Sequence, residues 1–165
     1  MPIWLRLARG GSRAKTRLLN EAEKQDMKNA EPRDTQLARL QKRALDSIHA
    51  GTQWLTAQQL DELRTGLDAP GAGLASQWQA GGKLFSIQID GREVFPRYAL
   101  GDDLEPLPAI QDVLKVFEGW SARATAGWFE SRSSFLAGRR PRELIAADAA
   151  RVLSAAQDLV MHLSQ

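Results

Sequence analysis

The chain of 165 residues contains no cysteine. This absence excludes disulfide bonds, thiolate metal sites and cysteine nucleophiles, and it is compatible with a reducing compartment. Histidine is scarce as well, because the chain has only His49 and His162, which are far apart in the sequence. Nucleotide-binding glycine motifs and metal-ligand spacings are missing, and no carboxylates pair within an apolar context. We therefore expect no enzyme activity, no metal site and no cofactor.

Long apolar runs are also missing. None approaches the roughly 20 residues that a membrane-spanning helix requires, and the first seven residues are interrupted by Arg6, so they lack the core of a signal peptide. Hydrophobic residues make up 43% of the chain and charged residues 25%, a balance typical of soluble proteins. The length leaves room for one ordinary domain or two small ones. We expect a cytoplasmic protein with no membrane partner.

The net charge of +2 is small but unevenly placed. Five basic residues precede the first acidic residue, Glu21: Arg6, Arg9, Arg13, Lys15 and Arg17. Such an arm can approach phosphates with little demand on geometry. The alternatives are a solvated leader, or residues upstream of a start at Met27. Residues 1–33 have no sustained periodicity and end near Pro32, which disfavours a helix at the residue before it, so we predict a flexible basic tail.

Two helices are predicted next. From Asp34 onward, apolar residues mark one helical face that ends near Gly51: Leu37, Leu40, Ala44, Leu45 and Ile48. Thr56 and Gln59 have the spacing of a capping box, which starts a second helix. Leu60, Leu63 and Leu67 continue that helix at matching intervals.

A short helix and a β-ribbon follow. After a break at residues 68–73, Leu74 and Trp78 lie four residues apart on a helix that Gly81-Gly82 ends. The period then changes, because Phe85, Ile87 and Ile89 alternate with polar residues. Asp90-Gly91 is a favoured two-residue hairpin turn, and the return strand contains Arg92, Val94 and Phe95. Pro96 predicts an edge position for that strand.

Helices, a short recognition-type helix and a hairpin together describe a winged helix-turn-helix, which places one helix in the DNA major groove. On the short helix, Ser76, Gln77 and Gln79 are available to read bases, since amides pair with adenine edges. Lys83, Arg92 and Arg97 around the ribbon are candidate phosphate contacts. The alternative is a helix–helix–hairpin unit that does not touch DNA, as in many small domains.

A turn-rich, acidic connector at residues 101–108 predicts a boundary, and residues 109–165 are predicted to be helical. Gly138 ends a helix, Pro141 begins the next, and Asp148 is an N-cap. The last helix has an apolar stripe that Leu153 and Val160 widen: Ala149, Val152, Ala156, Leu159 and Leu163. That face serves either the domain's own core or a partner. The predicted fold is mainly α with a small β-hairpin: a helical region with a winged-helix-like ribbon at 34–100 and a helical bundle at 109–165.

The most specific pattern lies in the last third of the chain. It combines a Trp-Phe pair, a Leu-x-Gly step, an Arg-Pro step and a Glu-Leu-Ile turn, at Trp128-Phe129, Leu136 to Gly138, Arg140-Pro141 and Glu143 to Ile145. This pattern resembles the C-terminal toxin-binding domain of the Xre/MbcA/ParS antitoxins. Most of these antitoxins have an all-helical Xre-type N-terminal part, whereas residues 83–97 here predict a ribbon, which looks like the front half of a subgroup. Of the adjacent Trp128 and Phe129, we take Trp128 as the core anchor.

The resemblance implies the antitoxin of a type II toxin–antitoxin system. Its partner would be a cognate toxin of the RES or ADP-ribosyltransferase type, contacted through Arg139, Arg140, Leu153 and Val160. The N-terminal half would bind operator DNA as a homodimer. From the residues alone, one arginine of the Arg-Pro turn is expected to hold the turn to Glu143 or to a helix C-terminus, with the others solvated. The rival reading is a stand-alone DNA-binding transcriptional regulator, or an adaptor whose C-terminal module only dimerises.

Overall fold

The computed structural model describes residue 24 and residues 33–68 and 72–165. The basic arm from Arg6 to Arg17, and with it nearly all of the predicted tail, lies outside these residues. The chain divides into two compact units, Met1–Lys42 and Arg43–Gln165. Helix α2 (Arg33–Gly51) runs across this division, and its last turns belong to the second unit.

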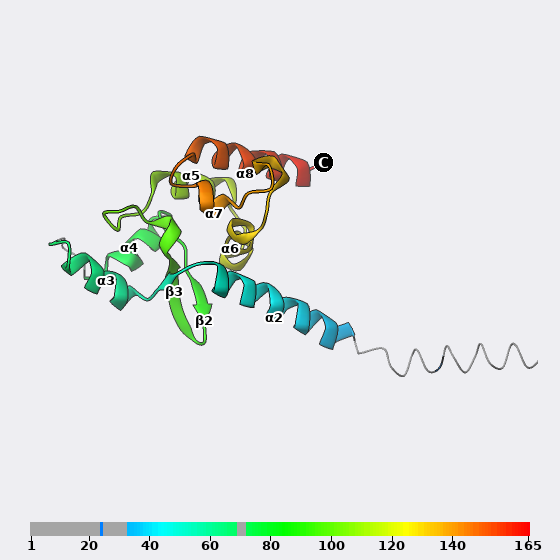
Figure 1. Ribbon diagram of the computed structural model, residues 1–165, viewed down its shortest axis with the longest axis horizontal. Coiled ribbons are helices and arrows are strands. Elements are labelled where there is room, and N and C mark those ends of the chain that lie inside the picture. The colour runs from blue at the N-terminus through cyan, green and yellow to red at the C-terminus, as the bar shows by residue number, and fades with distance from the viewer. Residues whose placement is uncertain (1–23, 25–32, 69–71) are drawn as a thin grey trace, which may run out of the picture. The chain divides into compact units, whose positions relative to one another are not determined.

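The fold is mainly helical with a small antiparallel sheet, as predicted. After α2 come β1 (Trp54–Leu55), α3 (Ala57–Thr65), α4 (Leu74–Ala80), β2 (Ile87–Ile89), β3 (Arg92–Pro96) and a 3-10 turn η1 (Arg97–Ala99). The order helix, strand, helix, helix, strand, strand is that of a winged helix-turn-helix, and the elements can be followed in Figure 1. The hairpin turn has Asp90 at φ 50° and Gly91 at φ 74°, the left-handed pair that a two-residue hairpin requires.

The sheet has the order β1-β3-β2, so β3 is its central strand. β2 pairs with β3 antiparallel with Ile87 opposite Val94, and β1 pairs with β3 with Leu55 opposite Phe95. The predicted edge position of the return strand is therefore wrong. Pro96 is tolerated because it is the last residue of β3, opposite Trp54. The chain resumes its pairing one residue later, where the Arg97 N–H donates to the Gln53 carbonyl at 2.9 Å.

Local signals define the two middle helices. The Thr56 hydroxyl accepts from the Gln59 N–H, and the Gln59 side chain accepts from the Thr56 N–H, which confirms the capping box. Gly81 caps the end of α4 as predicted. Burial agrees only in part with the predicted stripe of α3, because Leu60 is buried whereas Leu63 and Leu67 are exposed. On α2, likewise, Ile48 is buried while Leu37 and Leu40 are exposed.

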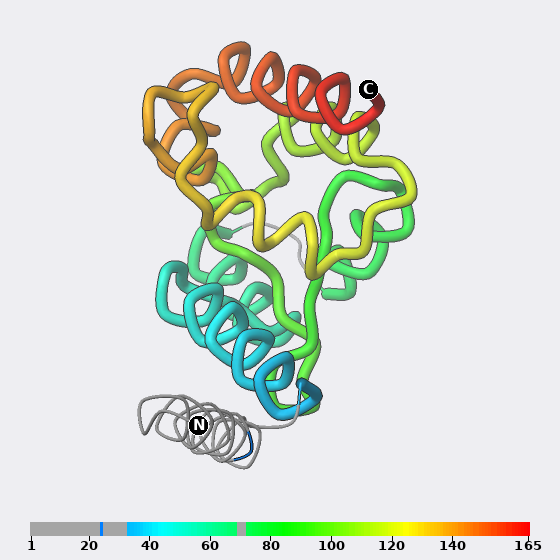
Figure 2. Tube along the Cα trace, turned by 90° about the vertical axis from the view of Figure 1, so that its right-hand side faces the viewer, coloured from blue at the N-terminus to red at the C-terminus, as the bar shows by residue number. Residues whose placement is uncertain are grey.

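Five elements follow the connector: α5 (Pro108–Val116), α6 (Ala122–Glu130), the 3-10 turn η2 (Ser134–Leu136), α7 (Pro141–Leu144) and α8 (Ala149–Leu163). The turn after η2 has Ala137 at φ 53° and Gly138 at φ 78°, so glycine meets a left-handed position as predicted. Pro141 opens α7, and the Asp148 carboxylate accepts from the Arg151 N–H at the start of α8. In both Figures 1 and 2, α8 packs along α5.

A single core of buried residues runs through the second unit, from Ile48 and Leu55 to Val152 and Ala156. The connector at 101–108 therefore lies within one compact unit, and residues on both sides of it share this core. At its centre the Phe129 ring is fully buried and lies against Phe85 and Tyr98, with ring centroids 5.9 Å and 5.0 Å apart. Trp128 is only half-buried. The core anchor of the adjacent pair is thus Phe129, and the expectation for Trp128 was wrong.

Candidate functional site

The first candidate surface, called here the recognition surface, consists of the exposed side of α4 and the β2–β3 turn. α4 begins after Gly73, whose N–H donates to the Asp61 carboxylate of α3 at 3.4 Å. Ala75 is buried and Leu74 and Trp78 are half-buried, so these three face inward as predicted. Ser76 and Gln77 consequently point to solvent, where their polar side chains are free to meet base edges.

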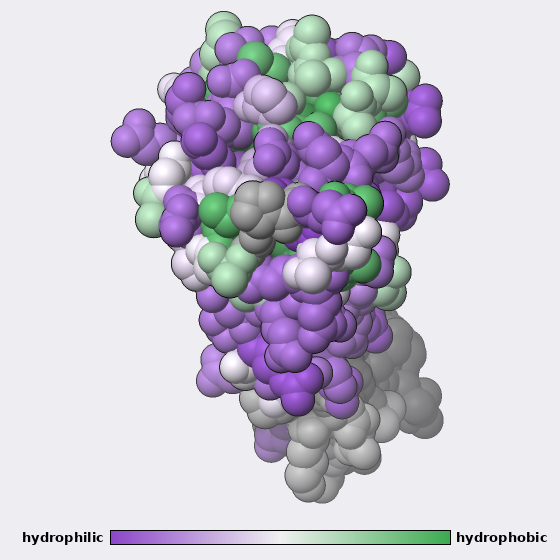
Figure 3. Space-filling view, turned by 90° about the vertical axis from the view of Figure 1, so that its left-hand side faces the viewer, coloured by the Kyte–Doolittle hydropathy of each residue, from purple (hydrophilic) through white to green (hydrophobic). Residues whose placement is uncertain are grey.

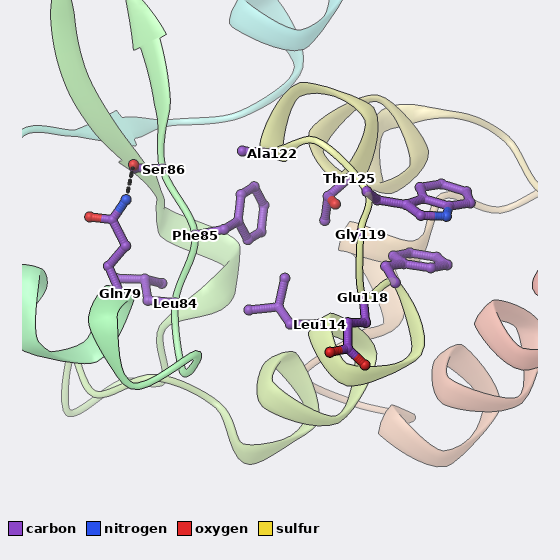
Figure 4. A pocket seen from close by; sticks show the side chains of 11 residues that line it. Gln79, Leu84, Phe85, Ser86, Leu114, Glu118, Gly119, Ala122 and Thr125 are labelled. Atoms are coloured by element: carbon purple, nitrogen blue, oxygen red, sulfur yellow. Dashed lines mark hydrogen bonds between the residues drawn. The ribbon is translucent and has the colours of Figure 1, made fainter.

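The Gln79 side chain, predicted to read bases, is hydrogen-bonded within the protein. Its Nε2 donates to the Ser86 hydroxyl at 2.8 Å, and that hydroxyl donates to Glu93 Oε1 at 2.7 Å. Figure 4 shows the first of these bonds joining α4 to the segment before β2. The amide and the hydroxyl therefore tie α4 to the base of the hairpin.

The predicted phosphate contacts differ in how available they are. Lys83 and Arg92 are exposed. Arg97 is half-buried, and its guanidinium donates to the carbonyls of Leu100 and Gly101 at 2.8 Å and 3.2 Å. Arg97 therefore holds the start of the connector against η1, a role that its position beside the ribbon did not indicate.

The structure adds one cation that the sequence pattern missed. Arg123, at the start of α6, is exposed and lines a hollow of about 220 Å³ together with Ser86, Ile87 and Gln88 from the hairpin side. No local signal points to Arg123, because it joins the hairpin only through tertiary packing. It places a third exposed basic side chain, after Lys83 and Arg92, beside the hairpin strand β2.

A neighbouring hollow of about 260 Å³ lies between the hairpin base and α5–α6, and Figure 4 shows its lining. Leu84, Phe85 and Leu114 contribute apolar walls. The buried polar groups in it already have partners, because Ser86 bonds to Gln79 and Glu93, and the Thr125 hydroxyl donates to the Ser121 carbonyl at 3.2 Å. The hollow thus presents no free buried polar group that would select a ligand.

The second candidate surface comprises the Arg-Pro turn, defined as residues 137–143, and the outer side of α8. Arg140 donates from Nε to the Glu130 carbonyl at 2.8 Å, and its own N–H donates to Glu143 Oε2 at 3.2 Å. Arg140 is therefore the arginine that holds the turn, both to Glu143 and to the C-terminus of α6. Arg139 is exposed. Of the two predicted toxin contacts in this turn, Arg139 is the one whose charge faces solvent freely.

The pKa of Glu143 reflects its place in the turn. The N–H of Arg140 and, to a smaller degree, the charges of Arg140 and Arg142 lower the pKa of Glu143 below its ordinary value. A carboxyl with a depressed folded pKa contributes stability above its unfolded pKa and loses it as the pH falls through the folded one. The contact that closes the Arg-Pro turn therefore persists at neutral pH and weakens only in acid.

On α8, the buried face consists of Val152, Ala155 and Ala156. Leu153 and Val160 are half-buried at its sides, and Met161 is 63% exposed. The predicted stripe ends before Leu163, which is exposed. Figure 3 shows apolar side chains among hydrophilic ones at the upper end of the molecule, where Figure 1 places α7 and α8.

Comparison with known proteins was informative only for the fold. No family model matches the chain, and no curated protein matches it. The chain is similar to a solved structure, the NMR structure of Rv2175c. The TM-score is 0.56, and the match covers 66% of this chain and 82% of that one at 18% sequence identity. A likeness at this level of identity shows a shared fold and nothing about activity.

Among residues 33–68 and 72–165, no group of three or more His, Asp or Glu side chains is placed to hold a metal ion. None of the helices in the described part of the chain is long and apolar enough to cross a membrane.

Proposed function

We propose that the protein is the antitoxin of a type II toxin–antitoxin system, which neutralises a cognate toxin through residues 109–165. The observation that carries the proposal is the outer side of α8. Leu153, Val160 and Met161 keep apolar area in solvent beside a fully packed face. Apolar side chains that remain exposed on one side of a folded helix are a common mark of a partner surface. The resemblance of residues 127–145 to the antitoxin domain supports the same surface.

The resemblance implies a toxin of the RES or ADP-ribosyltransferase type, inhibited when the antitoxin covers its active cleft. Arg139 lies on the Arg-Pro turn with its charge in solvent, and a guanidinium fork suits carboxylates on a partner. Arg140 contributes mainly by holding the turn in shape, because its Nε is engaged by the Glu130 carbonyl. The apolar area of α8 would supply most of the affinity, and Arg139 would supply orientation.

The same protein would bind operator DNA and repress its own operon. The winged-helix order of elements supports this part of the proposal. Ser76 and Gln77 of α4 would read bases, while Lys83, Arg92 and Arg123 would contact phosphates. The hairpin turn is only two residues long, so a single copy of the protein would cover only a short stretch of DNA. Two copies on symmetric half-sites would enlarge it, as in other helix-turn-helix dimers.

The second candidate function is a stand-alone transcriptional regulator or dimerising adaptor, and the winged-helix order favours it equally. Purification of the native protein from its own cells separates the two. A stable, stoichiometric small protein that inhibits growth when expressed alone supports the antitoxin. A homodimer without such a partner, recovered from cells in which the neighbouring genes are intact, supports the second function.

Val160→Glu tests the toxin surface. The variant is expected to keep its helical circular dichroism and lose neutralisation of the co-expressed toxin, because a carboxylate on the apolar face must be desolvated on binding. Gln88→Glu is the matched control, since it adds the same charge at an exposed position outside α8. Unfolding of the Val160 variant would assign Val160 to the core, and a folded variant that still neutralises would place toxin binding elsewhere.

The double variant Lys83→Ala with Arg92→Ala tests the recognition surface. Its affinity for DNA from the protein's own upstream region should fall, and the slope of log affinity against log salt should flatten by up to about two, one counterion per lost phosphate contact. The control pair Lys115→Ala with Arg151→Ala removes the same net charge from exposed sites on α5 and α8. If both double variants lost the same DNA affinity, or if the wild type did not bind DNA at low salt, the proposed role of the recognition surface would be wrong.

A further inference from the structure

Glu130, the last residue of α6, is a carboxylate withdrawn from water, with 6% of its side chain exposed. Arg142 of α7 approaches it with an Nε to Oε2 distance of 2.7 Å. On its other side the Thr52 hydroxyl donates to Oε1. Its main-chain carbonyl accepts from Arg140 Nε at 2.8 Å. One residue thus joins the Arg-Pro turn to the segment that follows α2.

Gly51 permits this approach. A Cβ placed on Gly51 would lie 2.9 Å from the Glu130 Cδ and closer still to Oε2, so a side chain at 51 would expel the carboxylate. One turn earlier on α6, a Cβ on Gly127 would lie 4.0 Å from the Ile48 side chain. The Trp54 indole donates to the Ile48 carbonyl at 3.0 Å and closes the end of α2. The end of α2 therefore packs directly against α6.

The contact between the end of α2 and α6 depends on a positive charge from the Arg-Pro turn. A carboxylate out of water is costly without a cation, and removal of one partner of such a pair leaves the other uncompensated. Arg142 is that cation, and it comes from the candidate partner surface. Thr52, on the other side, leads directly into β1, which pairs with the central strand of the winged-helix sheet. Arg142, Glu130 and Thr52 therefore connect the partner surface to that sheet.

Tyr98 is a candidate second donor for the carboxylate. Its hydroxyl is buried and has no hydrogen-bond partner among the described residues. Burial, with Glu130 as a second cause, raises the pKa of Tyr98 well above its usual value. The phenol therefore stays protonated, and its hydroxyl can donate a hydrogen bond. If Arg142 is drawn away, we expect the Tyr98 hydroxyl to become the donor that Glu130 turns to.

We propose that Glu130 couples the Arg-Pro turn to the base of the winged helix, so that a partner which draws Arg142 away loosens the junction between α2 and β1. This inference rests on the proposed function for the identity of the partner, a protein with acidic groups that compete for the turn's arginines. The coupling itself is a property of the free chain. Toxin binding would thereby alter how firmly the DNA-binding half is ordered.

The test is hydrogen exchange on the full chain with no partner present. Arg142→Met is expected to raise exchange at least ten-fold at β1 and at the Arg97 amide, which bonds to the Gln53 carbonyl. Arg151→Met, at an exposed position of α8, should leave these amides unchanged. Arg142→Lys keeps the cation and should give an intermediate rise, which preserves the test if the methionine variant unfolds. Unchanged exchange in both Arg142 variants overturns the coupling.

Two further variants separate coupling from local damage. Thr52→Val with Arg142→Met should raise junction exchange by less than the product of the single effects, because both act through Glu130. Tyr98→Phe should have little effect alone and should raise exchange further in the Arg142→Met background. If the exchange rates of both double variants equalled the product of the single effects, the inference would be overturned. None of these measurements needs toxin or DNA, so failure here leaves the proposed function standing, and absence of a toxin leaves the coupling standing.

Discussion

Phe129→Ala is expected to lower the free energy of unfolding of residues 43–165 by about 3–5 kcal/mol, the range for truncation of a fully buried aromatic. The ring is stacked on Phe85 and packs against Tyr98 and Trp128. Those rings belong to the segment before β2, to η1 and to α6, so the cavity would open where the winged-helix part meets the helical part. Urea unfolding followed by tryptophan fluorescence and circular dichroism measures the change.

Trp128→Ala is the matched control for that experiment. Trp128 is half-buried and rests edge-on against Phe117, with ring centroids 4.9 Å apart. Part of its surface is already in water, so its loss should cost less than that of Phe129. A larger effect at Trp128 than at Phe129 would contradict the placement of the two rings.

Arg64→Met is expected to destabilise the second unit by about 2–3 kcal/mol, as loss of charged hydrogen bonds to buried carbonyls does. The Arg64 side chain is 4% exposed and donates to the Leu104 carbonyl at 3.2 Å. It also lies 5.2 Å from the Trp78 ring centroid of α4, a cation–π distance. Methionine fills similar volume but leaves the carbonyl unsatisfied. Arg64 thus links α3, α4 and the connector through one guanidinium.

The control is Arg123→Met, which removes an exposed arginine from α6 and should change stability by no more than about 0.5 kcal/mol. The contribution from Glu105 should be minor, because the Glu105 side chain is 60% exposed and its distance to Arg64 is 3.7 Å. Added salt should therefore leave most of the difference between the two variants. If salt removed it, the ion pair rather than the carbonyl bonds would be the main contribution of Arg64.

The features that the sequence predicted well are those encoded within a few residues. Asp90-Gly91 specifies its turn, Thr56 and Gln59 cap each other, and Asp148 caps α8, all through contacts at most three residues apart. β1 was missed because two residues carry no periodicity, and Trp54-Leu55 is a strand only through its pairing with β3. Pro96 does not confine β3 to an edge, because it is the last residue of that strand, where the hydrogen-bond ladder ends.

The candidate surfaces were predictable in type but not in the use of each residue. Arg97 looked available beside the ribbon, yet it holds two carbonyls of the connector. Arg64 and Glu130 are charged residues in helices, and nothing in their spacing indicates that each is buried against a distant segment. Leu63 and Leu67 fit a helical stripe but remain exposed. In each case the outcome depends on which element packs against the helix, which is set by tertiary structure.

The ionisation of Tyr98 at high pH can be used to monitor the packing of the core. It is the only tyrosine of the chain, and its raised pKa means that the phenol ionises at a higher pH in the folded protein than in the unfolded chain. Its stabilising contribution is intact below the unfolded value near 10 and disappears as the pH rises through the folded pKa. Tyrosinate absorbance would consequently report a single interior position rather than an average. The Trp54 ring lies 6.4 Å away and can accept excitation energy from Tyr98, so loss of this transfer would report the separation of β1 from η1.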